Sequence, residues 1–104
     1  MLISNKIYIG EIFLNIVYQY KKLYNIDLSY MNYKLTDKCE YNDGRENPNW
    51  NKYQWIGSWT KLKYIVINKY YDEFMNKLNI KNKKQFMTQI IAHELAHEIY
   101  SNKD

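Results

Sequence analysis

The chain contains only two histidines, His93 and His97, and they enclose Glu94 in the run His-Glu-Leu-Ala-His. On an α-helix, residues four apart lie one turn apart on the same face, so the two imidazoles can contact one metal ion. Two neutral nitrogen ligands beside a carboxylate are typical of zinc sites. Glu94 projects to the side, where it could accept a proton from a water molecule at the ion. We therefore predict a divalent-metal site, with zinc as the expected cofactor, rather than two unrelated surface histidines.

The motif falls late in a predicted C-terminal helix. Asn82 is the expected N-cap, and Gln85 follows three residues later, as in a capping box. Apolar residues supply one flank of the helix: Phe86, Ile90, Ile91, Leu95 and Ile99. A helix with such a flank packs on a core, so we expect the histidines to face the interior or a cleft.

The rest of the chain predicts the elements that position this helix. Apolar residues at three-and-four spacing indicate a long helix over residues 9–23. Alternation suggests a short strand within residues 26–35, and residues 53–59 and 63–67 are expected to form a hairpin. A short helix follows over residues 71–78. The predicted fold class is α+β, with a long N-terminal helix, a small antiparallel sheet containing the hairpin, a short helix and the C-terminal motif helix.

The five residues from His93 to His97 form the motif of the zincin metallopeptidases. The order of the expected elements before it resembles the front of SprT-like and other small zincin domains. This likeness covers most of the chain as architecture, but only the five motif residues are specific. The resemblance implies that His93 and His97 are zinc ligands and that Glu94 is the general base of a peptidase.

Two departures from the zincin pattern concern the ligand set. Glu98 follows the second histidine, where the extended pattern usually has an uncharged residue. Zincins take a third ligand from beyond the motif helix, whereas only seven residues follow His97 here and none is histidine. The candidate additional ligands are Cys39, a soft ligand that suits zinc, and Asp104, which would have to curl back. A lone cysteine is also commonly a buried, inert thiol.

An aromatic group precedes the predicted hairpin turn. If residues 53–59 form a strand, then Tyr53, Trp55 and Trp59 share one face, and Trp50 lies nearby. These rings could pack over the motif helix as core or form a binding surface. The polar segment 36–51 is expected to be a long loop, and long loops often carry function.

Composition restricts the partners and the setting of the chain. The 104 residues are 46% hydrophobic and suit a single zincin-like domain over residues 1–104. The net charge is +4, but Arg45 is the only arginine and the lysines are scattered, which disfavours direct sequence-specific nucleic-acid binding. The single cysteine, with no signal-peptide or membrane-spanning pattern, predicts a cytoplasmic protein, in the host cytoplasm if phage-encoded.

Two functions are compatible with the sequence. One is a small zinc-binding protein that binds and inhibits a protein partner. Its size and composition resemble, in style alone, phage and mobile-element proteins such as the anti-CRISPR inhibitors, which block DNA access to a Cas nuclease. The other is a zinc-dependent metallopeptidase of SprT-like type. The lack of a downstream ligand favours the inhibitor, although a homodimer could supply Asp104 or Glu98 in trans.

Overall fold

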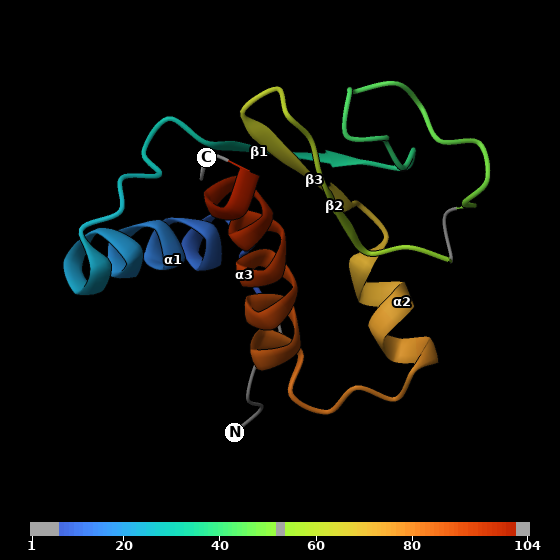
Figure 1. The fold of residues 1–104 in the computed structure, drawn as a ribbon. Coiled ribbons are helices and arrows are strands. Elements are labelled where there is room, and N and C mark those ends of the chain that lie inside the picture. Colours follow the sequence, from blue (N-terminus) through green and yellow to red (C-terminus); the bar gives the residue numbers. More distant parts are fainter. Residues whose placement is uncertain (1–6, 52–53, 102–104) are drawn as a thin grey trace.

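The computed structural model describes residues 7–51 and 54–101, which form three helices and one three-stranded sheet (Figure 1). This arrangement confirms the predicted α+β class and the predicted order of the helices. The elements in chain order are α1 (Ile9–Tyr24), β1 (Asn32–Thr36), β2 (Gly57–Trp59), β3 (Tyr64–Asn68), α2 (Tyr71–Lys77) and α3 (Lys83–Ser101).

The sheet is mixed, so the prediction of an antiparallel sheet is wrong for one of its two strand pairs. The strand order is β1-β3-β2, with β3 in the middle. β3 is antiparallel to β2 but parallel to β1, with Tyr33 opposite Ile65. Apolar alternation shows which residues face the core, but it does not show strand direction. The long segment between β1 and β3 provides the crossover that a parallel pair needs.

The first strand begins later than the alternation suggested, because residues 27–31 form turns. The backbone N–H of Ser29 donates to the Asp27 carboxylate at 2.9 Å. The N–H of Met31 donates to the Leu28 carbonyl at 3.0 Å. These local bonds compete with strand pairing, and β1 therefore starts at Asn32.

β2 and β3 form the predicted hairpin, although β2 is only three residues long. Tyr53, the expected start of this strand, lies outside the described residues. Before β2, the backbone is held by buried Asn68, whose N–H donates to the Ile56 carbonyl at 2.9 Å and whose side-chain amide donates to the Trp55 carbonyl at 2.8 Å. These bonds connect the segment before β2 to the end of β3.

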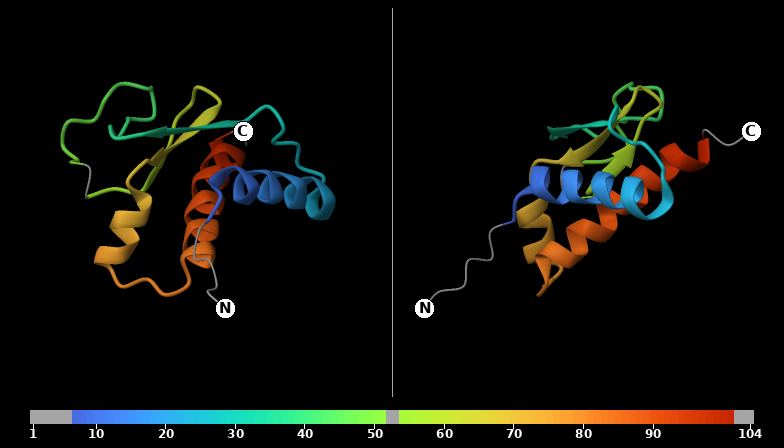
Figure 2. Two further views of the ribbon diagram at one scale, coloured as in Figure 1. Left: turned by 180° about the vertical axis from the view of Figure 1, so that it is seen from behind. Right: turned by 90° about the vertical axis from the view of Figure 1, so that its left-hand side faces the viewer.

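α1 and α3 cross on the same side of the sheet, and α2 lies beside the N-terminal half of α3 (Figures 1 and 2). The predicted cap of α3 is confirmed, since the Gln85 N–H donates to the Asn82 side chain at 3.0 Å. The core between these layers consists of Ile9, Ile12, Phe13, Ile16, Leu28, Met31, Ile65, Ile67, Met75, Met87, Ile91 and Leu95.

The buried side chains of α1 all lie in its N-terminal half, between Ile9 and Ile16. Its C-terminal half projects away from α3 (Figure 1), where Val17 and Tyr20 are only partly buried and Leu23, a member of the predicted apolar stripe, is 62% exposed. The burial of the predicted stripe therefore decreases toward the C-terminal end of α1. Among the described residues, no helix has the length and apolar character needed to span a bilayer.

Candidate metal centre

α3 brings the two histidines together as the motif predicted. The Nε2 atoms of His93 and His97 lie 3.3 Å apart. The two rings meet edge to face, with their centroids 4.8 Å apart and their planes at 90°. Both side chains are exposed, so a ligand from solvent can reach them.

The separation of the two nitrogens fits a tetrahedral zinc ion. Two imidazoles bound at about 2.0–2.1 Å, with a tetrahedral angle between them, would have nitrogens about 3.3–3.4 Å apart. The separation observed between His93 and His97 is 3.3 Å. In a metal-free chain, the same distance allows one neutral imidazole to donate a hydrogen bond to the other. The separation of the two nitrogens is thus compatible both with one bound zinc ion and with a direct hydrogen bond.

Glu94 lies beside the histidines but has a different environment. Its side chain is only 8% exposed, and ligand atoms of His93, Glu94 and His97 all lie within 4.8 Å of one another. Burial raises the pKa of the Glu94 carboxyl, and the charge of His93 opposes this only in part. A carboxylate with a raised pKa is a better proton acceptor near neutral pH than an exposed one.

Gly57 is a residue of this centre that the sequence analysis did not identify. A Cβ atom at this position of β2 would lie 2.9 Å from Cγ2 of Ile90 and 3.4 Å from Cγ of Glu94. Glycine therefore allows β2 to approach α3 directly over the Glu94 side chain. Its position inside a predicted strand was the available signal, because glycine there often marks a close backbone approach.

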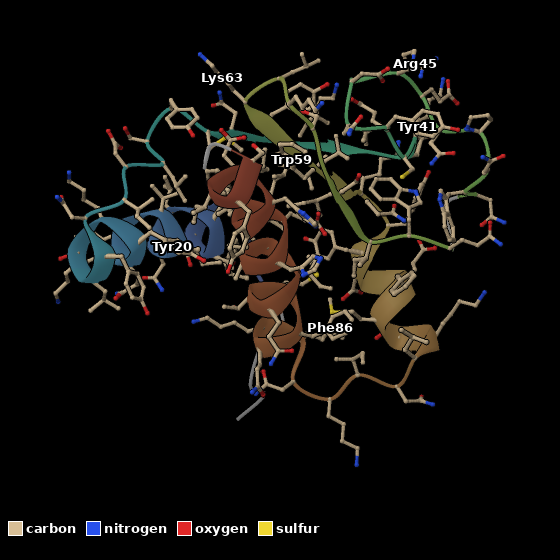
Figure 3. The ribbon with its side chains drawn as sticks, viewed as in Figure 1. Tyr20, Tyr41, Arg45, Trp59, Lys63 and Phe86 are labelled. Atoms are coloured by element: carbon tan, nitrogen blue, oxygen red, sulfur yellow. The ribbon has the colours of Figure 1, made fainter. Side chains whose placement is uncertain are left out.

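The histidines and Glu94 line an open hollow of about 620 Å³ between α3, β2 and the loop that follows β1. Trp59 lies beside α3, and Tyr41 lies on the loop (Figure 3). Among the described residues, no lysine or arginine lines this hollow. The lining consists of Cys39, Glu40, Tyr41, Asn42, Asn47, Trp50, Gln54, Trp55, Gly57, Ser58, Trp59, His93, Glu94 and His97.

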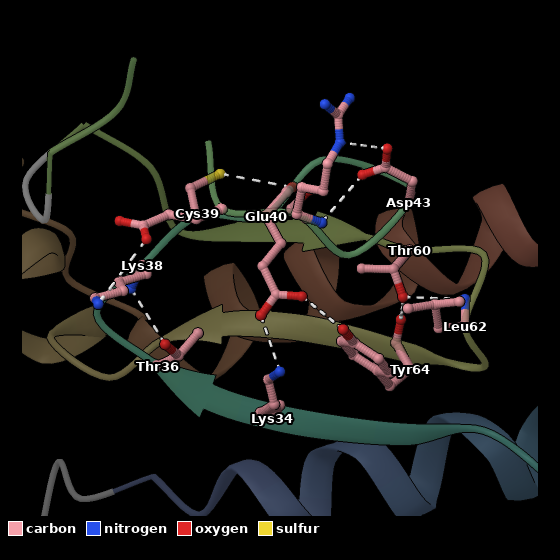
Figure 4. Close-up of polar contacts among 12 residues, drawn as sticks. Lys34, Thr36, Lys38, Cys39, Glu40, Asp43, Thr60, Leu62 and Tyr64 are labelled. Carbon is pink, nitrogen blue, oxygen red and sulfur yellow. Dashed lines mark hydrogen bonds and ion pairs between the residues drawn. The ribbon is translucent and has the colours of Figure 1, made fainter. Parts of the chain in front are cut away.

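The predicted additional ligands do not join this group among the described residues. Cys39 lines the same hollow but lies outside the set of ligand atoms in mutual reach. Its thiol is buried and contacts the Glu40 carbonyl at 4.0 Å (Figure 4), and burial raises its pKa. Asp104 lies outside the described residues. Ligation by Cys39 or Asp104 stays a prediction.

The acidic residues of the loop are engaged with other side chains. Glu40 accepts a hydrogen bond from the Tyr64 hydroxyl at 2.6 Å and pairs with Lys34 at 2.9 Å, as Figure 4 shows. Asp43 pairs with Arg45 at 2.6 Å. The Glu40 contacts join the loop to β1 and β3, and the Asp43 contact lies within the loop.

The aromatic residues separate into core and site. Trp55 is buried with Cys39 and Val66, which supports core packing for this ring. Trp50 is 48% exposed on the wall of the hollow, and Trp59 is half-buried with its ring stacked on His97. The aromatic group is therefore neither core alone nor binding surface alone: Trp55 packs in the core, whereas Trp50 and Trp59 lie at the hollow. Tyr53 lies outside the described residues.

No protein-family model, curated protein or solved structure matches this chain. The resemblance to zincin metallopeptidases therefore stays a prediction that rests on the five motif residues and the order of the elements.

Proposed function

We propose that this chain is a zinc-binding protein whose centre hydrolyses peptide bonds. The observation that carries the proposal is the 3.3 Å separation of the His93 and His97 Nε2 atoms at an open hollow, with the Glu94 carboxyl beside them. Structural zinc sites are closed by four protein ligands, whereas catalytic sites keep an open position. The exposure of both imidazoles supports the second type.

Each residue has a separate role in this proposal. His93 and His97 hold the ion, which when bound would polarise a carbonyl and lower the pKa of water. Glu94 takes the proton from the attacking water and passes it to the leaving amine. Its low exposure keeps the carboxylate from bulk water and its raised pKa suits proton transfer. A hollow of about 620 Å³ has the size of a typical ligand site and can hold a short peptide segment.

The test compares Glu94→Gln with the wild-type chain. The amide keeps the size of the side chain but cannot accept a proton, so we expect zinc-dependent cleavage of a quenched fluorescent peptide library to fall by about 10²–10⁴-fold. Zinc content, measured by mass spectrometry, stays at one ion per chain. Glu73→Gln, at an exposed carboxylate of α2, is the matched control and should keep wild-type turnover. Equal turnover in both variants would contradict the role of Glu94.

A second candidate is partner binding and inhibition without catalysis. It is supported by the exposed apolar side chains on the projecting part of α1, among them Tyr18, Leu23 and Tyr24, which are 58–66% exposed. In this case the chain holds zinc and cleaves no library peptide, and Glu94→Gln is indistinguishable from wild type. A nucleic-acid enzyme as the inhibited partner stays a prediction from composition.

A further inference from the structure

Trp59 contacts two consecutive residues of α3 in different ways. Its ring stacks on the His97 imidazole, with the ring centroids 6.0 Å apart and the planes at 27°. Its indole N–H donates to the Glu98 carboxylate, with 3.0 Å between Nε1 and Oε1. Trp59 of β2 is therefore held by Glu98, and its ring lies against His97, a candidate metal ligand.

The Glu98 carboxylate is itself held from a second direction. The Tyr30 hydroxyl, from the segment before β1, donates to its other oxygen at 2.6 Å. Glu98 is only 5% exposed, and hydrogen bonds to a carboxylate are stronger than those between neutral groups. These two bonds fix the carboxylate and, through it, the plane of the Trp59 indole.

Among the described residues, no carboxylate or backbone carbonyl accepts a hydrogen bond from the His97 imidazole. A metal-binding histidine normally donates its second ring N–H to a carboxylate, a carbonyl or water, and that bond orients the ring. Within the described residues, the hydrogen-bonding partner of each imidazole is the other imidazole. The flat contact with Trp59 is therefore the interaction that limits rotation of the His97 ring from the side of the sheet.

We propose that Trp59 and Glu98 are positioning residues for the metal centre. Glu98 fixes the indole, and the indole holds the His97 ring so that its Nε2 atom faces that of His93 before an ion arrives. Such preorganisation strengthens binding because less side-chain freedom is lost when the ion binds. The inference rests on the proposed metal centre and adds two residues to it, neither of which touches the ion.

The experiment measures zinc affinity by competition with a chromophoric chelator for three substitutions of tryptophan. Trp59→Leu removes the ring and the N–H, and we expect about 10–100-fold weaker binding. Trp59→Phe keeps a ring that can stack and should lose less. Trp50→Phe, at an exposed ring on the wall of the same hollow, is the matched control and should bind like wild type. Circular dichroism at the assay temperature establishes that each chain is folded.

A second measurement separates positioning from general stability. Each variant is saturated with Co²⁺, and its visible absorption spectrum reports the ligand geometry of the folded, loaded chain. Altered band shape in the Trp59 variants but not in Trp50→Phe supports the positioning role; if Trp59→Leu fails to fold, Trp59→Phe carries the comparison. Wild-type affinity and spectra in both Trp59 variants would overturn the positioning role alone. Absence of metal binding by the wild-type chain would overturn the proposed centre and this role together.

Discussion

Two carboxylates on the same face of α3 have opposite environments. Glu94 and Glu98 are one helical turn apart, and both are buried, at 8% and 5% exposure. Glu98 accepts hydrogen bonds from Tyr30 and Trp59. Among the described residues, no hydrogen-bond donor contacts the Glu94 carboxylate, which lies at the hollow with the two histidines.

This difference separates a reactive group from a structural one. A buried carboxylate without donors is costly in its charged form, so its pKa rises and it accepts protons readily. A buried carboxylate with two donors is stabilised and holds its neighbours in place. The same residue type, repeated four positions apart, thus supplies a candidate base at one turn of α3 and a support for His97 at the next turn.

The largest expected effect is on metal binding at His93 and His97. His93→Ala and His97→Ala each remove one of two nitrogen ligands, and zinc affinity should fall by at least about 100-fold. Chelator competition measures this loss, and the apo chains should keep wild-type stability because both side chains are exposed. Unchanged zinc affinity in either variant would show that the ion binds elsewhere.

The next effect concerns the Glu98 carboxylate, which accepts hydrogen bonds from Tyr30 and Trp59. Glu98→Gln keeps the shape of the side chain but weakens the bonds from Tyr30 and Trp59. We expect the free energy of unfolding in urea to fall by about 1.5–3 kcal/mol. The same substitution at Glu94 breaks no hydrogen bond within the described residues and should not destabilise the metal-free chain. Equal losses at the two positions would remove the contrast between the carboxylates.

A substitution at Gly57 tests whether β2 must approach α3 closely beside Glu94. Gly57→Ala places a Cβ atom 2.9 Å from Cγ2 of Ile90, a β-branched side chain with few rotamers on a helix, so we expect destabilisation of about 1–3 kcal/mol. Combining it with Ile90→Ala removes the clashing methyl group, and the double variant should lose less than the sum of the single changes. Additive losses in urea unfolding would indicate that this contact is not the cause.

The pH dependence of the metal-free chain has a definite sign at Glu94. Burial raises the pKa of its carboxyl in the folded chain, so the unfolded chain releases this proton at lower pH. Stability should therefore decline as pH rises from the ordinary carboxyl range through the raised value. Glu94→Gln removes this part of the decline, measured by urea unfolding in EDTA. Parallel pH profiles for the variant and the wild type would contradict the unfavourable environment assigned to Glu94.

The smallest effect concerns Cys39. Because its thiol is buried and its pKa is raised, disulfide exchange with a chromogenic reagent should be at least about tenfold slower in the folded chain than in urea. Zinc should not slow the reaction further if the ion is held by the histidines without Cys39. Additional protection by zinc would instead support the predicted cysteine ligand.

The sequence predicted the parts of the site that depend on local geometry. The spacing of His93 and His97 on one helix is sufficient to bring their nitrogens together, and the cap at Asn82 gave the start of that helix. The hairpin and the helix order also followed from local patterns. These features depend on neighbours along the chain, which composition and periodicity report.

The parts that the sequence did not predict depend on distant residues. The parallel pairing of β1 with β3 depends on the path of a long connection. The contact of Tyr30 with Glu98 joins residues 68 positions apart. The stacking of Trp59 on His97 depends on the position of β2 over α3. No periodicity encodes such contacts, and the tertiary structure was needed to separate Glu98 from Glu94.

A Co²⁺ titration of the purified chain tests directly whether His93 and His97 together hold one metal ion. We expect visible absorption bands of a tetrahedral ion that saturate at one equivalent, disappear on addition of Zn²⁺, and are absent from the His93→Ala, His97→Ala double variant. A wild-type chain that shows no such bands, or a double variant that shows the same ones, would contradict a metal site at this pair.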